Sequence, residues 1–230
     1  MLMDISPSTA APENGGALYA TLMGDLIASE AAASVSRLHQ SFNAAIARAN
    51  AAPETGILSP LTVTLGDEFQ GICANLSQGA RLMRRLRADL LEQGVECRFV
   101  LGLVRIETPL NRERAWNMMG PGLAAAREKL GDKRDPNAYR FHLPGGAAIE
   151  QLLEAVGAGL SAVEAGWTER QREIVLAAAT GDVAANAKRF GVSPKTVYKI
   201  RQAAQYDLYM RQWAAVDVAV RSLDGAYGLS

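Results

Sequence analysis

The chain has 230 residues, with 24 Lys plus Arg and 24 Asp plus Glu, so its formal net charge is zero. Hydrophobic residues make up 49% and charged residues 21%, a globular balance that excludes long disorder and fibrous repeats. A chain of this length buries a core without disulfides, and Cys73 and Cys97 have no His or Cys companions at the spacing of a zinc site. With no secretory signal and no apolar run that could span a bilayer, we expect a cytoplasmic protein with no membrane partner.

The first 51 residues predict a leader, a strand and a helix. Residues 1–16 are rich in Pro, Ser, Asn and Gly, which predicts a flexible leader. The apolar run that starts at Ala17 predicts a buried strand that stops at Gly24 and Asp25. Apolar residues spaced three and four apart then predict a helix over 34–51.

A hairpin follows this helix. The β-prone runs LTVTL and FQGICA are separated only by Gly66, Asp67 and Glu68. Such a glycine-containing connection is typical of a tight turn between antiparallel strands. The tip of the predicted hairpin therefore carries two carboxylates.

The rest of the N-terminal half completes an alternating pattern of strands and helices. We expect a helix over 77–93, a strand at CRFVLGLVRI, a helix opened by GPGLAAAREKL, and a short strand at YRFHL. In the helix over 77–93 we expect Arg81, Arg84, Arg85 and Arg87 to form a solvated face. The order β, α, β, β, α, β, α, β predicts an α+β protein whose residues 17–146 form a ferredoxin-like domain, an antiparallel sheet with its helices on one face.

Helix-forming residues dominate after Gly146. Residues 147–166 predict a connecting helix, weakened by Gly157 and Gly159, between which it can bend. Residues 167–230 then predict an all-α domain.

The start of this domain has the pattern of a helix-turn-helix. Thr168 and Gln171 form a capping box, Gly191 supplies a left-handed turn, and Ser193 with Pro194 opens a capped helix. Val192, Val197 and Ile200 are its expected core positions.

The charge of this module points to DNA. Residues 167–212 carry eight basic and four acidic residues, a net charge of +4, whereas residues 1–166 have a net charge of −3. Between Lys188 and Arg201 there is no acidic residue. Basic side chains on such a unit neutralise phosphates, and the N-terminal residues of its last helix face base edges. The expected DNA-binding residues are Lys188, Arg189, Ser193, Lys195, Thr196, Lys199 and Arg201.

WTERQREIVLAAATG followed by AKRFGVSPKTVYKIR resembles the helix-turn-helix of LuxR-type regulators and of region 4 of sigma factors. The alternative is a helical module of the same shape that binds protein. After Ala203 the apolar residues keep a helical period, which predicts a packing helix or a dimer contact.

Asp25 and Asp67 are expected side by side, because the strand before Asp25 and the hairpin strands are neighbours in a ferredoxin-like sheet. Paired carboxylates repel each other unless a cation neutralises them, and such oxygen ligands suit Mg²⁺ or Mn²⁺. Gly120, Gly122 and Arg127 could hold a phosphate at a helix N-terminus. The alternative for Asp25 and Asp67 is turn chemistry, in which each Asp accepts local backbone N–H groups.

YATLMGDLIAS and LTVTLGDEFQGI resemble the bacterial SatD family over essentially the whole chain, and more distantly class III nucleotidyl cyclases and the GGDEF hairpin of diguanylate cyclases. The resemblance to cyclases implies a metal site at Asp25, the carbonyl of Leu26, Asp67 and Glu68. It also implies nucleotide contacts at Gly24, Gly66, Gly120, Gly122 and Arg127. Asp25, Asp67 and Arg127 are the candidate catalytic residues. Leu123 stands where class III cyclases have Asn, and Leu65 stands where the GGDEF motif has its first glycine. These departures favour a degenerate domain over an active enzyme.

The sequence therefore supports three hypotheses. The first is a dimeric DNA-binding transcriptional regulator whose cyclase-like domain senses a nucleotide or a metal ion. The second is a Mg²⁺- or Mn²⁺-dependent nucleotidyl cyclase or nucleotidyltransferase with a helix-turn-helix tail. The third is a nonenzymatic adaptor whose tail binds protein.

Overall fold

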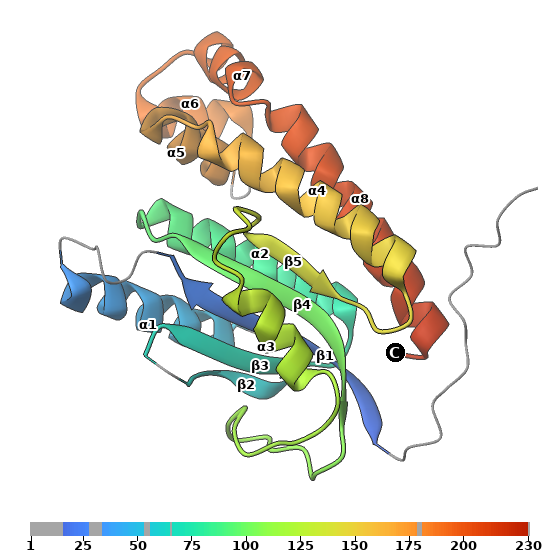
Figure 1. Cartoon of the computed structure of the whole chain (residues 1–230). Helices are drawn as coiled ribbons and strands as arrows, with labels where there is room; N and C mark the ends of the chain where they lie inside the picture. The colour runs from blue at the N-terminus through green and yellow to red at the C-terminus, as the bar shows by residue number, and fades with distance from the viewer. Residues whose placement is uncertain (1–15, 28–33, 53–55, 65, 179–180, 230) are drawn as a thin grey trace, which may run out of the picture.

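The computed structural model describes residues 16–27, 34–52, 56–64, 66–178 and 181–229 (Figure 1). The predicted leader lies outside these residues except for Gly16. The elements in chain order are β1 (Ala17–Leu26), α1 (Val35–Ala51), β2 (Ile57–Val63), β3 (Glu68–Cys73), α2 (Leu76–Glu92), β4 (Cys97–Ile106), α3 (Leu123–Gly131), β5 (Tyr139–His142), α4 (Ala147–Ala165), α5 (Glu169–Ala177), α6 (Val183–Phe190), α7 (Pro194–Ala203) and α8 (Tyr206–Tyr227). This order matches the predicted one.

The fold is α+β, with a five-stranded sheet in the order β2-β3-β1-β4-β5. β1 pairs antiparallel with β3 and with β4, and β2 pairs antiparallel with β3. β3 therefore lies between β1 and β2, which α1 connects. β5 pairs parallel with β4, so the sheet is mixed rather than wholly antiparallel.

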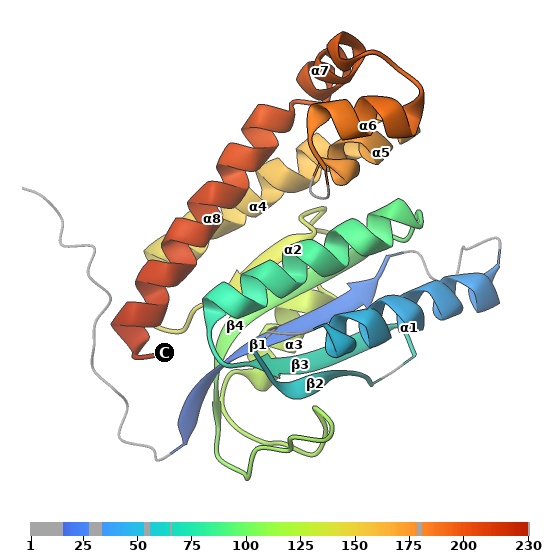
Figure 2. The same ribbon diagram turned by 180° about the vertical axis from the view of Figure 1, so that it is seen from behind.

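Helices cover both faces of the sheet. α1 and α2 lie on one face and α3 lies on the other, as the two opposite views show (Figures 1 and 2). The prediction that all helices share one face is wrong for α3. The reason is the central strand β4: Phe99 and Leu101 belong to the core under α1 and α2, whereas Val100 and Val104 pack with Leu123 on the opposite face. A strand that is apolar on both sides needs cover on both sides.

The C-terminal helices α4 and α8 pack on the sheet layer instead of standing apart from it. α4 lies along β5 (Figure 1), and α8 lies along α2 (Figure 2). Trp213, Val216 and Val220 of α8 join the same core cluster as Phe69 and Phe99 of the sheet. α8 is thus a packing helix, one of the two roles expected for it.

Helices α5, α6 and α7 form a compact three-helix unit at one end of the α4 and α8 pair (Figure 1). The unit has a small core of its own made by Ile174, Ala187 and Val197, against which Val192 and Ile200 pack. The predicted core positions are confirmed.

Local capping explains where the helices of this unit begin and end. The Thr168 capping box is present at the start of α5. The Asp182 side chain caps α6, and the Ser193 side chain accepts the N–H of Thr196 at the start of α7. Gly191 takes the left-handed conformation, φ 64°, that the turn between α6 and α7 requires.

Candidate functional sites

A row of charged side chains crosses the sheet on the face that α3 covers. In the strand pairing Asp25 lies opposite Glu68 of β3 and opposite Arg98 of β4. Asp25 and Arg98 are each only 7% exposed, and Arg98 Nε lies 3.5 Å from Asp25 Oδ2. The centre of the row is therefore a buried carboxylate and guanidinium pair.

The electrostatics of Asp25 are dominated by its burial. Burial raises the pKa of the Asp25 carboxyl to about 6, although the Arg98 guanidinium acts to lower it. The neighbouring carboxylates of Asp67 and Glu68 add to the rise. The cost of burying the charge exceeds the attraction of its partner.

The predicted acidic residues do come together at the end of β1. The backbone N–H of Leu26 donates to the carbonyl of Asp67 at 3.0 Å, which ties the end of β1 to the hairpin between β2 and β3. Within the described part of the chain, however, no three His, Cys, Asp or Glu side chains form a group that could hold a metal ion. The partner that the structure gives the Asp25 carboxylate is the guanidinium of Arg98.

Arg127 of α3 joins the row through β3. Its Nη2 donates to Gln70 Oε1 at 3.0 Å, and its Nε lies 3.7 Å from Glu68 Oε2. The side chain of Arg127 keeps 46% of its surface exposed. Arg127 is thus an oriented cation that remains accessible.

The four predicted nucleotide-binding glycines do not converge. A Cβ on Gly24 would lie 2.2 Å from the ring of Phe69, and one on Gly120 would lie 1.9 Å from the carbonyl oxygen of Arg105. These two glycines therefore permit close packing. Gly66 and Gly122 have positive φ, of 84° and 98°, so they serve the hairpin turn and the start of α3.

The start of α3 lies far from the acidic residues. Gly122 sits beside Leu103 and Val104 of β4, six residues along the strand from Arg98. At about 3.3 Å per residue this is a separation of about 20 Å. The predicted phosphate contacts of Gly120 and Gly122 and the predicted acidic site at Asp25 therefore lie apart.

The predicted DNA-binding residues all lie in α6, α7 and the turn between them. Lys188, Arg189, Lys195 and Lys199 are exposed. Arg189 Nη2 also lies 3.5 Å from Glu92 Oε1 at the end of α2. Among the residues that the structure describes, Lys188, Lys195 and Lys199 have no ion-pair partner, whereas Arg189 bridges to the sheet layer.

The other predicted DNA-binding residues make contacts within the C-terminal helices. Ser193 Oγ accepts the Thr196 N–H at 3.1 Å and lies 2.9 Å from Thr196 Oγ1, so both hydroxyls take part in capping α7. The Arg201 guanidinium stacks on Tyr206, 5.0 Å from the ring centre, and is half-buried. Arg201 therefore joins α7 to α8.

Tyr198 belongs to the same exposed surface, although it is not among the DNA-binding residues predicted from the sequence. Its side chain is 62% exposed, and Lys195, Tyr198, Lys199 and Gln202 are all exposed on α7. Positions three, four and seven apart share one helix face. This spacing in the sequence could have identified Tyr198.

A model of the SatD family (SatD) matches residues 19–216, and the chain belongs to this family. A search of curated proteins found no match. Among the helices of the described residues, none is both long enough and apolar enough to cross a bilayer.

Proposed function

We propose that this SatD family member is a DNA-binding transcriptional regulator, in which α6 and α7 form a helix-turn-helix and the N-terminal domain senses a small ligand. The observation that carries the proposal is the surface of α6 and α7, which is exposed, basic and free of acidic residues from Lys188 to Arg201. The resemblance of this segment to LuxR-type regulators and sigma region 4 supports the same function.

The exposed face of α7 has the composition of a recognition helix. Lys195 and Lys199 can neutralise phosphates or bind guanine edges, and Gln202 can bind adenine. Tyr198 adds an apolar surface with a hydroxyl between the two lysines. Because α7 is anchored through Val197 in the unit's own core, this face stays free to enter a major groove.

A homodimer would present two such faces to DNA, and the outer face of α4 supports one. The charged residues of α4 are Glu150, Glu154 and Glu164, and all three pair inward, with Lys129 or Arg87. The exposed residues of α4 are therefore uncharged: Ala147, Ala148, Gln151, Leu152, Ala155, Ala158, Ala162 and Ala165. A second copy of the same face could pack against it without burying a charge.

For the N-terminal domain the geometry favours sensing over catalysis. The position of β3 between β1 and β2 supports a ferredoxin-like, cyclase-like domain. The Asp25 carboxylate, however, pairs with Arg98 where the cyclase pattern would use it for a metal ion. We therefore place Mg²⁺- or Mn²⁺-dependent nucleotidyl transfer second to ligand sensing.

The test is binding to a labelled mixed-sequence duplex of about 30 base pairs, or about three helical turns, measured by fluorescence anisotropy over a series of salt concentrations. We expect the affinity for DNA to fall as the salt concentration rises, because basic side chains that bind phosphates release counterions from the DNA. The double variant Lys195→Ala/Lys199→Ala should bind at least tenfold more weakly and show a salt slope smaller by about two.

The matched control is Arg221→Ala, which removes one positive charge from an exposed position of α8. It should bind DNA as the unchanged protein does. An affinity that does not depend on salt, or an equal loss in Arg221→Ala, would contradict the proposal. Light scattering of the free protein in the same series measures whether it is a dimer.

A further inference from the structure

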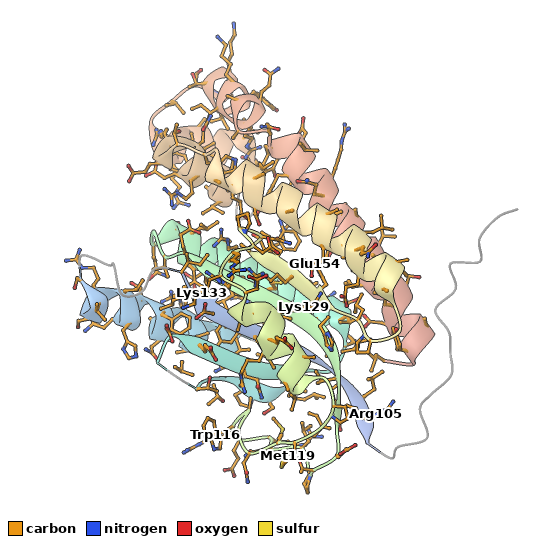
Figure 3. The ribbon with its side chains drawn as sticks, in the orientation of Figure 1. Arg105, Trp116, Met119, Lys129, Lys133 and Glu154 are labelled. Atoms are coloured by element: carbon orange, nitrogen blue, oxygen red, sulfur yellow. The ribbon has the colours of Figure 1, made fainter. Side chains whose placement is uncertain are left out.

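A cleft of about 280 Å³ lies on the α3 face, between the hairpin strands, α3 and the loop that joins β4 to α3. Its walls include Gln70 of β3, Leu123 and Arg127 of α3, and Ala115, Trp116 and Met118 of the loop. This volume suits one small molecule and is too small for a polymer. Figure 3 shows Trp116 on the loop at the edge of the sheet layer.

The loop, residues 107–122, is held in place although it contains no helix or strand. Asn111 Oδ1 accepts the N–H groups of Glu113 and Arg114, each at 3.0 Å, and Asn111 Nδ2 donates to the carbonyl of Trp116 at 3.2 Å. The N–H of Ala115 donates to Thr62 Oγ1 of β2 at 3.0 Å. Loops of this length that are fixed by specific contacts are often binding loops.

This fixed backbone presents an exposed indole. Trp116 is 55% exposed, while Ala115 and Met118 on either side of it are buried and anchor the loop. An indole on a rigid support is a stacking surface for a flat aromatic ring such as a nucleobase.

Arg127, which also lines the cleft, supplies a cation. Gln70 orients the guanidinium of Arg127 through the 3.0 Å hydrogen bond, and Gln70 Nε2 in turn donates to the carbonyl of Ala115 at 3.3 Å. The arginine and the tryptophan loop are thus connected through one side chain. The exposed part of the Arg127 fork keeps donors for an anion, and guanidinium binds phosphate with two parallel hydrogen bonds.

We propose that this cleft binds a nucleoside monophosphate, with the base stacked on Trp116 and the phosphate held by Arg127. Thr64 and Asn117 also line the cleft and offer polar groups to the edge of the base. This inference rests on the proposed function, in which the N-terminal domain senses a small ligand, and it adds the chemical class of that ligand. The cleft adjoins the charged row that contains Asp25, because Arg127 also lies 3.7 Å from Glu68.

Tryptophan fluorescence tests the proposal directly, because Trp167 and Trp213 are only 8% and 1% exposed and Trp116 is the accessible fluorophore of the three. The full chain is titrated with AMP, GMP, CMP and UMP, with the matching nucleosides, and with inorganic phosphate. We expect saturable quenching by at least one monophosphate, at least tenfold tighter than by its nucleoside or by phosphate alone.

Two variants and a control test which residue binds the phosphate and which binds the base. Calorimetry measures the affinities as a second readout. Arg127→Gln should weaken the monophosphate at least tenfold and leave the nucleoside unchanged. Trp116→Ala should weaken both. Arg114→Gln removes an exposed arginine from the same loop, outside the cleft lining, and should bind as the unchanged protein does.

The proposal is overturned if no monophosphate binds at millimolar concentration, or if Trp116→Ala keeps full affinity. Binding of triphosphates alone, lost in Asp67→Asn, would assign the ligand to the acidic cluster instead. Self-association that Trp116→Ala abolishes, without nucleotide binding, would make the loop a protein contact. The Lys195→Ala/Lys199→Ala experiment tests the proposed function separately. DNA binding without nucleotide binding would contradict only the proposed ligand of the cleft. Nucleotide binding without DNA binding would contradict only the proposed role as a DNA-binding regulator.

Discussion

Asp25 is a carboxylate that the fold buries beside a single cation. Its folded pKa of about 6 exceeds the ordinary value of 3.8, so between these pH values the folded state holds a proton that the unfolded state has released. The contribution of Asp25 to stability is therefore largest at low pH and is lost as pH rises through about 4 to 6.

The variant Asp25→Asn removes this titration. We expect its free energy of unfolding, relative to that of the unchanged protein, to rise as pH increases from about 4 to 7, because only the unchanged protein must bury a charge. Urea unfolding at each pH measures the difference. A difference that stays constant across this range, or changes in the opposite direction, would show that folding does not raise the pKa of Asp25.

At this scale the sequence predicted part of the site. The glycine and aspartate pairs at 24–25 and 66–67 were sufficient to place Asp25 beside the hairpin, because their strands are neighbours in the predicted sheet. Arg98 was not predicted as the partner of Asp25. It lies inside an apolar strand segment, and its contact depends on the register between β1 and β4, which the sequence does not specify.

At the scale of elements, α4 shows why a glycine can be necessary inside a helix. A Cβ on Gly157 would lie 2.2 Å from the carbonyl oxygen of Tyr139, so the glycine lets α4 pack directly on the backbone of β5. A Cβ on Gly159 would instead meet the end of the flexible Gln212 side chain. The sequence identified both glycines as weak points of a helix but could not distinguish these two surroundings.

The two glycines make a matched pair of alanine variants. Gly157→Ala should lower the free energy of unfolding by about 2 kcal/mol, since the backbone of β5 cannot move aside and overpacking costs about 1–3 kcal/mol. Gly159→Ala should be neutral or stabilising by up to about 1 kcal/mol, because Gln212 can rotate away and alanine favours a helix. Chemical denaturation of both variants gives the comparison, and a larger loss in Gly159→Ala would contradict the packing argument.

The packing of α3 against the second face of the sheet is an element that the sequence placed wrongly. The extent of α3 was predicted from its opening glycines, but the face was not. The sequence of β4 contained a signal for the second face. Val100, Val104 and Ile106 lie on the side opposite Phe99 and Leu101, so both sides of this strand are apolar and both need a covering layer.

At the scale of the whole molecule, one aromatic row connects the N-terminal helix to the C-terminal one. Neighbouring ring centres are 6.0, 6.1, 6.5 and 5.3 Å apart along Phe42, Phe69, Phe99, Tyr139 and Trp213. The row starts in α1, passes through residues of β3, β4 and β5, and ends in α8. The C-terminal helices therefore share the core of the sheet layer, and the two parts of the chain should unfold together.

A buried polar cluster next to this row joins the same parts. Arg87 of α2 and Glu164 of α4 are 2.9 Å apart, with side chains 5% and 2% exposed. The hydroxyls of Tyr139 and Tyr209 both donate to Glu164 Oε1. Arg87 was expected on a solvated face, because nothing near it in the sequence shows that α4 would cover it.

This cluster yields a prediction with a built-in control, since Arg87 has a second partner. Glu96 also lies 2.9 Å from Arg87, but its side chain is 48% exposed. Glu164→Gln should lower the free energy of unfolding by about 3 kcal/mol, because it leaves a buried guanidinium without its buried counter-charge. Glu96→Gln should cost less than about 1 kcal/mol, because water replaces an exposed partner.

Urea unfolding followed both by tryptophan fluorescence and by helix circular dichroism measures the two losses. In Glu164→Gln the two signals should still change at one midpoint, shifted to lower urea, since the pair lies inside a core that the sheet and α8 share. If the midpoints separate, the C-terminal helices unfold independently of the sheet. If the two variants lose equal stability, the buried pair contributes no more than the exposed one, and the apolar row alone holds α4 and α8 in place.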